Sequence, residues 1–136
     1  PSGKKAAFLR QAGAECRLVG VTVHEARLEE IARSEIAGIV TQFAIAGPHF
    51  ICRAFATLTD FARLCLPMLG GDSLVLAMKS QRVDDEIAEL RVTVPQLEVL
   101  AVEPLSIPGQ SVQRSLVVMQ PARQAGGAPT ITTSGT

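Results

Sequence analysis

Residues 49–71, HFICRAFATLTDFARLCLPMLGG, contain the change of pattern that decides the fold. The first part, HFICRA (49–54), is short and mainly apolar, and predicts a buried strand. The second part, TLTDFARLCLPMLGG (57–71), predicts a helix that Pro67 kinks or shortens and that two glycines end. Arg53 therefore lies where a strand passes into a helix. A strand that leads directly into a helix is the repeating unit of α/β proteins.

The same alternation continues on both sides of this stretch. Helices are expected at 3–15, 27–47 and 83–90, and strands at 19–26, 73–79, 97–105 and 112–120. In the helix at 27–47 only the first half is well supported, because Gly38 weakens the second half by roughly 1 kcal/mol. The alternation predicts a mostly parallel, doubly wound α/β sheet with helices on both faces. The last two strands are joined by a short Pro- and Gly-containing linker, which predicts an antiparallel C-terminal strand.

Composition limits the classes of protein to consider. The chain has 136 residues, of which 47% are hydrophobic, with 13 Lys and Arg against 13 Asp and Glu. A net charge of zero argues against a dedicated basic clamp for nucleic acid, although a local basic patch remains compatible with it. Three cysteines without a CxxC pair predict buried thiols in a reducing compartment, the cytoplasm. No run of about 18 apolar residues is present that would span a bilayer.

Two further predictions concern domain limits and metals. Residues 1–120 are expected to form one partial domain, and the Gly-, Ala-, Pro- and Thr-rich residues 121–136 a disordered tail. His24 and His49 lack the spacing of metal ligands, so no metal site is expected.

Five segments resemble, in order, the GidB/RsmG family of bacterial methyltransferases. They are GKKAAFLRQ, ARLEEIA, CRAFATLTDF, LPML…LAMKSQ…DDEIAEL and RSLVVMQ. The resemblance runs from about residue 2 to 120. It implies a class I methyltransferase form of the doubly wound sheet and S-adenosyl-L-methionine as cofactor. It also implies, as substrate, the N7 atom of a guanine in 16S ribosomal RNA of the small ribosomal subunit, with no membrane and no metal involved.

The same resemblance implies the cofactor-binding residues. Leu28 and Glu29 match positions that contact the adenosine part of the cofactor, and Arg53 matches the cofactor-site arginine. A guanidinium at the end of a strand is suited to hold the methionine carboxylate through two hydrogen bonds. Without the resemblance, Arg53 is more simply a surface arginine, and Glu29 with Glu30 a solvated first helical turn favoured by the helix dipole.

Substrate-binding residues are implied as well. Lys4, Lys5 and Arg10 form a basic helix face that can meet RNA phosphates, and Lys79 ends the strand at 73–79. The simpler interpretation is a solvated helix face and an exposed strand end. No catalytic acid or base is expected, because guanine N7 carries a free lone pair and the sulfonium donor is already activated; alignment of the two is what the enzyme must supply.

The sequence also departs from the family pattern. The glycine-rich cofactor loop and the acidic residue that holds the ribose are absent, and the first central strand is expected to be missing with them. His49 stands where the family has Asp, and Ser80 where it has Gly. The chain is therefore expected to be a fragment or incomplete copy of such an enzyme. The alternative is a non-catalytic α/β binding or assembly module that has lost the cofactor loop.

Overall fold

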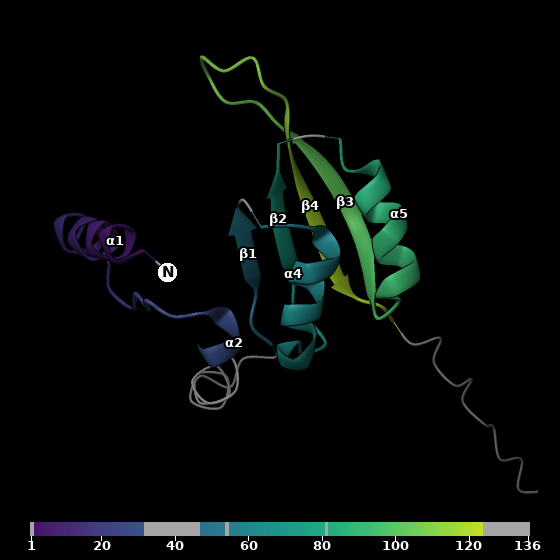
Figure 1. The fold of residues 1–136 in the computed structure, drawn as a ribbon, viewed down its shortest axis with the longest axis horizontal. Coiled ribbons are helices and arrows are strands. Elements are labelled where there is room, and N and C mark those ends of the chain that lie inside the picture. The colour runs from purple at the N-terminus through teal and green to yellow at the C-terminus, as the bar shows by residue number, and fades with distance from the viewer. Residues whose placement is uncertain (1, 32–46, 54, 81, 124–136) are drawn as a thin grey trace, which may run out of the picture. The chain divides into compact units, whose positions relative to one another are not determined.

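The computed structural model describes residues 2–31, 47–53, 55–80 and 82–123. Two compact units can be distinguished, Pro1–Ala44 and Ile45–Thr136, and each is described here by itself (Figure 1). Two predictions, the second half of the helix at 27–47 and the disordered tail, lie outside the described residues from position 32 and position 124 onward, respectively.

The first unit contains two helices, α1 (Gly3–Glu15) and α2 (Leu28–Ile31). The prediction of a helix at 3–15 is confirmed. Arg17 adopts a positive φ of 52° after the helix, and the amide of Leu18 donates to the carbonyl of Gly13 at 2.9 Å. This is the hydrogen-bond pattern of a Schellman motif, which satisfies carbonyls left open at a helix end.

The strand predicted at 19–26 is wrong. The structure gives these residues no strand, and the side chains of Val19 and Val21 are 96% and 58% exposed. Alternating valines favour a strand only where a neighbouring strand supplies hydrogen bonds and an apolar surface covers one face. Within the described residues of the first unit, no strand is available to pair with this segment.

The second unit contains a four-stranded sheet in the order β1-β2-β4-β3. Its strands are β1 (Phe50–Arg53), β2 (Val75–Lys79), β3 (Leu97–Leu105) and β4 (Arg114–Pro121). β1 pairs with β2 in parallel, whereas β4 lies antiparallel to both β2 and β3. Three strands therefore run in one direction and the C-terminal strand runs against them, which confirms the prediction of a mixed α/β sheet with an antiparallel C-terminal strand.

Two helices and a short 3₁₀ turn complete this unit: α4 (Leu58–Cys65), η1 (Leu66–Met68) and α5 (Asp84–Thr93). The hydroxyl of Thr57 caps α4 by accepting from the amide of Asp60 at 3.0 Å. The α-helix ends at Cys65 and continues as η1, which contains Pro67. The expected shortening by this proline is confirmed, since proline has no amide hydrogen to donate.

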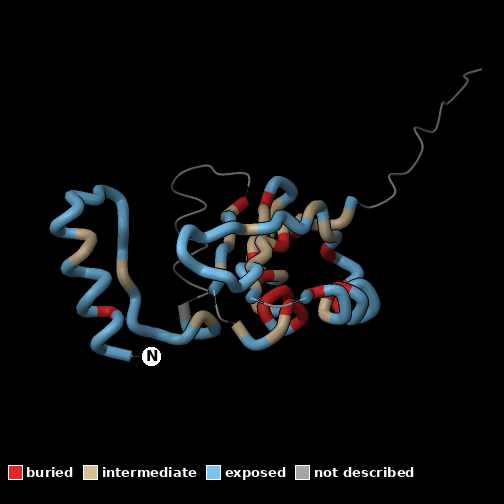
Figure 2. Tube along the Cα trace, turned by 90° about the horizontal axis from the view of Figure 1, so that it is seen from above, coloured by how far each residue is buried: buried red, intermediate tan, exposed pale blue. Residues whose placement is uncertain are grey.

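The core lies between the sheet and one layer of helices. Figures 1 and 2 show α4 and α5 on the same face of the sheet, with the buried residues gathered where they meet the strands. The buried core consists of Leu58, Phe61, Ala62, Cys65, Val75, Ala77, Val83, Ile87, Leu90, Val94, Leu97, Val117 and Met119. The expectation of helices on both faces is not met in the described part of this unit.

The opposite side of the sheet is called the open face here. It carries the side chains of Ile51, Leu76, Met78, Leu116 and Val118, which the pairing register aligns across β1, β2 and β4. Ile51 is 62% and Met78 38% exposed. The sequence alternation that places one set of apolar residues under the helices leaves the second set uncovered by the described elements.

Candidate functional site

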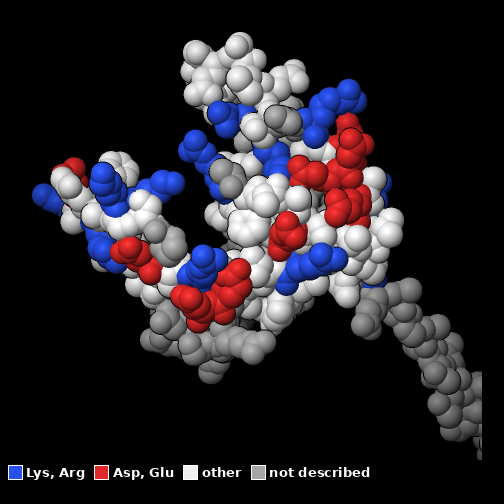
Figure 3. All heavy atoms as spheres, in the orientation of Figure 1, with Lys and Arg blue, Asp and Glu red and all other residues white. Residues whose placement is uncertain are grey.

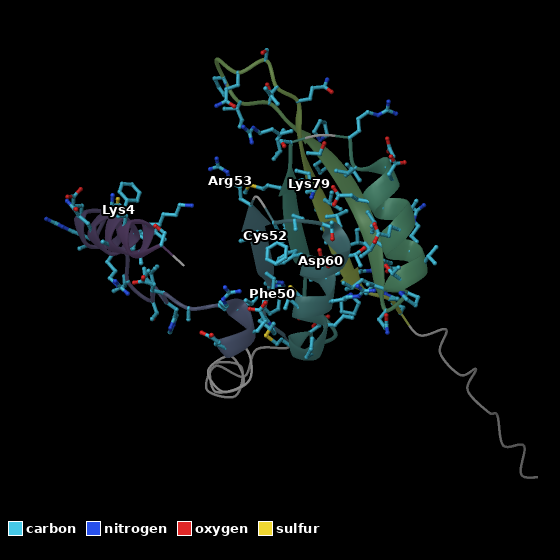
Figure 4. All side chains as sticks on the ribbon, in the orientation of Figure 1. Lys4, Phe50, Cys52, Arg53, Asp60 and Lys79 are labelled. Carbon is cyan, nitrogen blue, oxygen red and sulfur yellow. The ribbon has the colours of Figure 1, made fainter. Side chains whose placement is uncertain are left out.

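The carboxyl ends of β1 and β2 are the place to look for a site. In open α/β sheets, ligands bind beyond the carboxyl ends of the parallel strands. Arg53 is the last residue of β1 and Lys79 the last of β2, so each of these two strands ends on a cation (Figure 4).

The two cations face opposite sides of the sheet. Arg53 is in register with Met78, so its side chain lies on the open face. Lys79 is one residue further along, and shares the helix-covered face with Val75 and Ala77. Both residues lie at the same end of the sheet because they end neighbouring parallel strands, but the pleat directs their side chains to opposite faces.

Arg53 is exposed, and the ion pairs within the described residues do not include it. Figure 4 shows it at the arrowhead end of β1. A guanidinium in this position has its fork of donors available for a carboxylate or phosphate.

Lys79 is engaged within the protein. Its ammonium lies 2.9 Å from Glu86 Oε2 and donates to the carbonyl of Ala56 at 3.4 Å. The side chain of Lys79 is only 13% exposed, and that of Glu86 28%. The interpretation of Lys79 as a plain exposed strand end therefore does not describe its surroundings.

Glu86 connects this ion pair to the start of α4. The same atom, Oε2, accepts a hydrogen bond from the amide of Leu58 at 2.8 Å. A carboxylate at a helix N-terminus is stabilised by the open amides and by the helix dipole. Figure 3 shows acidic side chains gathered over α5, and Glu86 is the one directed to α4 and Lys79.

Cys52 lies beside this group, on the helix-covered face of β1. Burial raises the pKa of its thiol to about 11, against a smaller lowering by the charge of Lys79. Burial also raises the pKa of Cys65 on α4 to about 12, with a further rise from Cys52. Neither thiol is an activated nucleophile, because thiolate formation is disfavoured at both.

The other residues expected at the site belong to the first unit. Lys4 and Lys5 are exposed in the first turn of α1. Leu28, half-buried, begins α2, and Glu29 is exposed in its first turn. The structure thus places Lys4, Lys5, Leu28 and Glu29 on helices of the first unit, as expected.

Two residues of interest were missed by the sequence predictions. Glu86 lies in the motif DDEIAEL. Its contacts with Leu58, 28 positions away, and with Lys79, 7 positions away, leave no local pattern in the sequence. Arg114, in RSLVVMQ, begins β4; its Nη2 donates to Gln110 at 3.3 Å, while its buried Nε has no hydrogen-bond partner among the residues that the structure describes. Both were inside segments that carried the family resemblance, which was the available signal.

Other kinds of site find little support. Over the described ranges, no group of three or more His, Cys, Asp or Glu side chains is placed to hold a metal. A shallow apolar pocket lies at η1 and the glycines after it, and is completed by Gln96 and Pro121 rather than by Arg53 or Lys79. None of the helices described is long and apolar enough to cross a membrane.

Comparison with known proteins gives a consistent result. The family model for rRNA small subunit methyltransferase G (GidB) matches residues 1–117. Relatives named ribosomal RNA small subunit methyltransferase G include those of Polynucleobacter asymbioticus, 37% identical over 89% of this chain, and of Methylibium petroleiphilum, 37% identical over 85%. That of a Roseiflexus species is 38% identical over 86% of the chain. The chain spans about half the length of these relatives, namely 50%, 46% and 48%.

Proposed function

The chain belongs to the rRNA small subunit methyltransferase G family, and from this premise we propose that it carries part of an S-adenosyl-L-methionine-dependent methyltransferase. The proposed substrate is the N7 atom of a guanine in 16S ribosomal RNA, on the small ribosomal subunit in the cytoplasm. The fold is proposed to be the class I methyltransferase form of the doubly wound sheet. The mixed sheet with its antiparallel C-terminal strand supports this proposal.

The observation that carries the proposal is the position of Arg53. Its exposed guanidinium stands at the carboxyl end of a parallel strand, without an ion-pair partner among the described residues. That arrangement fits a carboxylate such as the one on the methionine part of the cofactor. Leu28 and Glu29 are proposed to contact the adenosine part.

The remaining roles concern RNA and alignment. The cofactor would supply a methyl group on a sulfonium, which needs no activating base. Lys4 and Lys5, exposed on α1, are proposed to contact RNA phosphates. Lys79 was also a candidate for such contact. Its engaged ammonium, however, points to a different contribution.

Arg53 provides the test of cofactor binding. S-adenosyl-L-methionine is titrated into the 136-residue chain and followed by NMR, which detects weak binding. Arg53→Ala is expected to weaken binding by about ten- to a hundredfold, corresponding to a charged hydrogen bond of ~1.5–3 kcal/mol. Arg53→Lys should recover only part of this loss, because an ammonium cannot reproduce the guanidinium fork.

The matched control is Arg91→Ala, a change of the same kind in the last turn of α5. It should leave binding unchanged. Equal affinities for wild type, Arg53→Ala and Arg53→Lys would remove Arg53 from the cofactor site. Transfer of a labelled methyl group to 16S ribosomal RNA by the chain would exclude the alternative, a non-catalytic binding or assembly module.

A further inference from the structure

Three elements, α5, β2 and α4, meet at one carboxylate oxygen. Glu86 Oε2, from α5, lies 2.9 Å from the ammonium of Lys79 at the end of β2 and 2.8 Å from the amide of Leu58 at the start of α4. The ammonium of Lys79 also reaches the carbonyl of Ala56, 3.4 Å away. The pair therefore holds the backbone of residues 56 and 58, which follows Arg53 closely in the chain.

The parts of this group depend on one another. Removing the lysine would leave the partly buried carboxylate of Glu86 with only an amide as partner. Removing the carboxylate would leave a lysine that is 13% exposed without a counter-charge, and the amide of Leu58 without its acceptor. Breaking one side of such a partly buried pair costs more than the pair itself contributes, because an uncompensated group is left behind.

We propose that Lys79 and Glu86 are positioning residues, which together hold the backbone of Ala56 and Leu58 at the start of α4 and so restrain the nearby end of β1, from which Arg53 projects. The effect of this pair on cofactor binding rests on the proposed role of Arg53. The restraint of the backbone by the pair does not depend on that role. This role differs from direct contact of Lys79 with RNA. Lys79 faces the helix-covered side of the sheet, where its ammonium is paired with Glu86, whereas Arg53 faces the open face.

The structural part is tested by amide hydrogen exchange at Leu58 in the 136-residue chain. Lys79→Met keeps the length and removes the charge, and Glu86→Ala removes the acceptor. Both are expected to raise the exchange rate of the Leu58 amide by about tenfold relative to the average of the α4 amides. Glu86→Gln, which retains an acceptor oxygen, should preserve more of the protection, and Lys79→Arg most of it.

The chain offers a matched control in its other described ion pair. Arg82 and Asp84 lie 3.4 Å apart, with side chains 94% and 76% exposed. Arg82→Met and Asp84→Asn should leave the exchange of Leu58 unchanged. A Lys79→Met protein that folds, as judged by circular dichroism, and whose Leu58 exchanges like wild type would overturn the proposal. If Lys79→Met does not fold, Glu86→Ala, which removes the acceptor for the Leu58 amide, decides the same question.

The thiol of Cys52 gives a second readout, in which position and charge act in opposite directions. It is measured in a Cys16→Ser background to remove the exposed thiol. Lys79 lowers the pKa of Cys52, so loss of its charge alone predicts a slower reaction with a thiol reagent in Lys79→Met. Release of the backbone at Ala56 and Leu58 would expose Cys52, which predicts a faster reaction with the reagent. A several-fold faster reaction is expected, and a slower reaction would contradict the proposal.

Cofactor titration connects the pair to function. If Lys79 and Glu86 act through Arg53, then Lys79→Met weakens cofactor binding, Glu86→Gln weakens it less, and neither weakens it further in an Arg53→Ala protein. A direct RNA contact predicts instead that Lys79→Met weakens RNA binding while Glu86→Gln, which removes a competing carboxylate, strengthens it; that result would also overturn the proposal. Should wild type fail to bind cofactor, the proposed function fails, while exchange at Leu58 and reactivity of Cys52 still decide the positioning role.

Discussion

At the scale of single residues, the end of β1 shows how the pleat divides chemistry between two sides. Cys52 faces the helices and the interior, whereas its neighbour Arg53 faces outward on the open face. The same strand therefore contributes a protonated thiol to the core and a permanent charge to the surface. Alternation of this kind is a property of the backbone, and it assigns each side chain to its surroundings.

The raised pKa values of Cys52 and Cys65 predict how stability depends on pH. Burial raises the pKa of Cys52 to about 11 and that of Cys65 to about 12, above the usual thiol value of 9.0. Between pH 9 and these values the unfolded chain binds fewer protons than the folded one, so the free energy of unfolding should fall as the pH rises above 9. Urea unfolding at pH 8, 9 and 10 measures this decline. It should be less steep in Cys65→Ala, and equal slopes in both proteins would show that Cys65 does not contribute.

Gly47 is predicted to be intolerant of a side chain because of close packing. A Cβ atom there would contact Ser73 Oγ and come within 2.8 Å of Gly70 Cα. Gly47→Ala should therefore destabilise the protein by about 1–3 kcal/mol, the usual cost of overpacking. Gly71→Ala is the control, since a Cβ atom at Gly71 has nothing within 4 Å. Equal unfolding midpoints in urea for the two variants would contradict this prediction.

At the scale of elements, α4 is defined by its two ends. Two side chains accept hydrogen bonds from amides of its first turn. Thr57, directly before the helix, accepts from Asp60, and Glu86, on α5, accepts from Leu58. At the other end, Pro67 lies in the 3₁₀ turn that follows Cys65. The buried face of α4 includes Leu58, Phe61 and Cys65, so the orientation of α4 on the sheet follows from helical spacing.

Loss of the cap should therefore be measurable. Thr57→Ala removes the acceptor for the amide of Asp60 and is expected to lower the free energy of unfolding by about 1 kcal/mol. Thr57→Ser retains the acceptor and should restore most of it. Thr22→Ala, at an exposed position outside any helix, is the control. A loss as large in Thr22→Ala, or none in Thr57→Ala, would count against the cap.

At the scale of the whole molecule, the described elements of the second unit cover one side of its sheet and leave the other side open. The open face presents Ile51 and Met78 to solvent, and β1 has β2 as its hydrogen-bonding neighbour on one side only in the described sheet. An apolar face beside a free strand edge favours association.

The isolated chain is therefore expected to self-associate. Sedimentation velocity should show a sedimentation coefficient that rises with concentration for wild type. Ile51→Lys should reduce this dependence, because a charge on the open face opposes pairing. Val92→Lys, at an 82% exposed position on α5, provides the control and should behave like wild type. A monodisperse wild-type monomer at all concentrations would refute the prediction.

Much of the element pattern followed from the sequence. The apolar run at 50–53 and the helix after Thr57 are visible because strand propensity, capping and proline act over a few neighbouring residues. The strand predicted at 19–26 shows the limit of the same reasoning. Alternating valines satisfy the local pattern, but a strand also requires a partner, which no local pattern guarantees.

The candidate site divides in the same way. By itself, the sequence determined most of the element types, the family and the presence of Arg53 and Lys79 at the ends of strands. Only the tertiary structure decided that these cations face opposite sides and that Glu86 joins Lys79 to the start of α4. The physical reason is distance along the chain: propensities and caps act between near neighbours, whereas an ion pair or a sheet register depends on segments that meet only after folding.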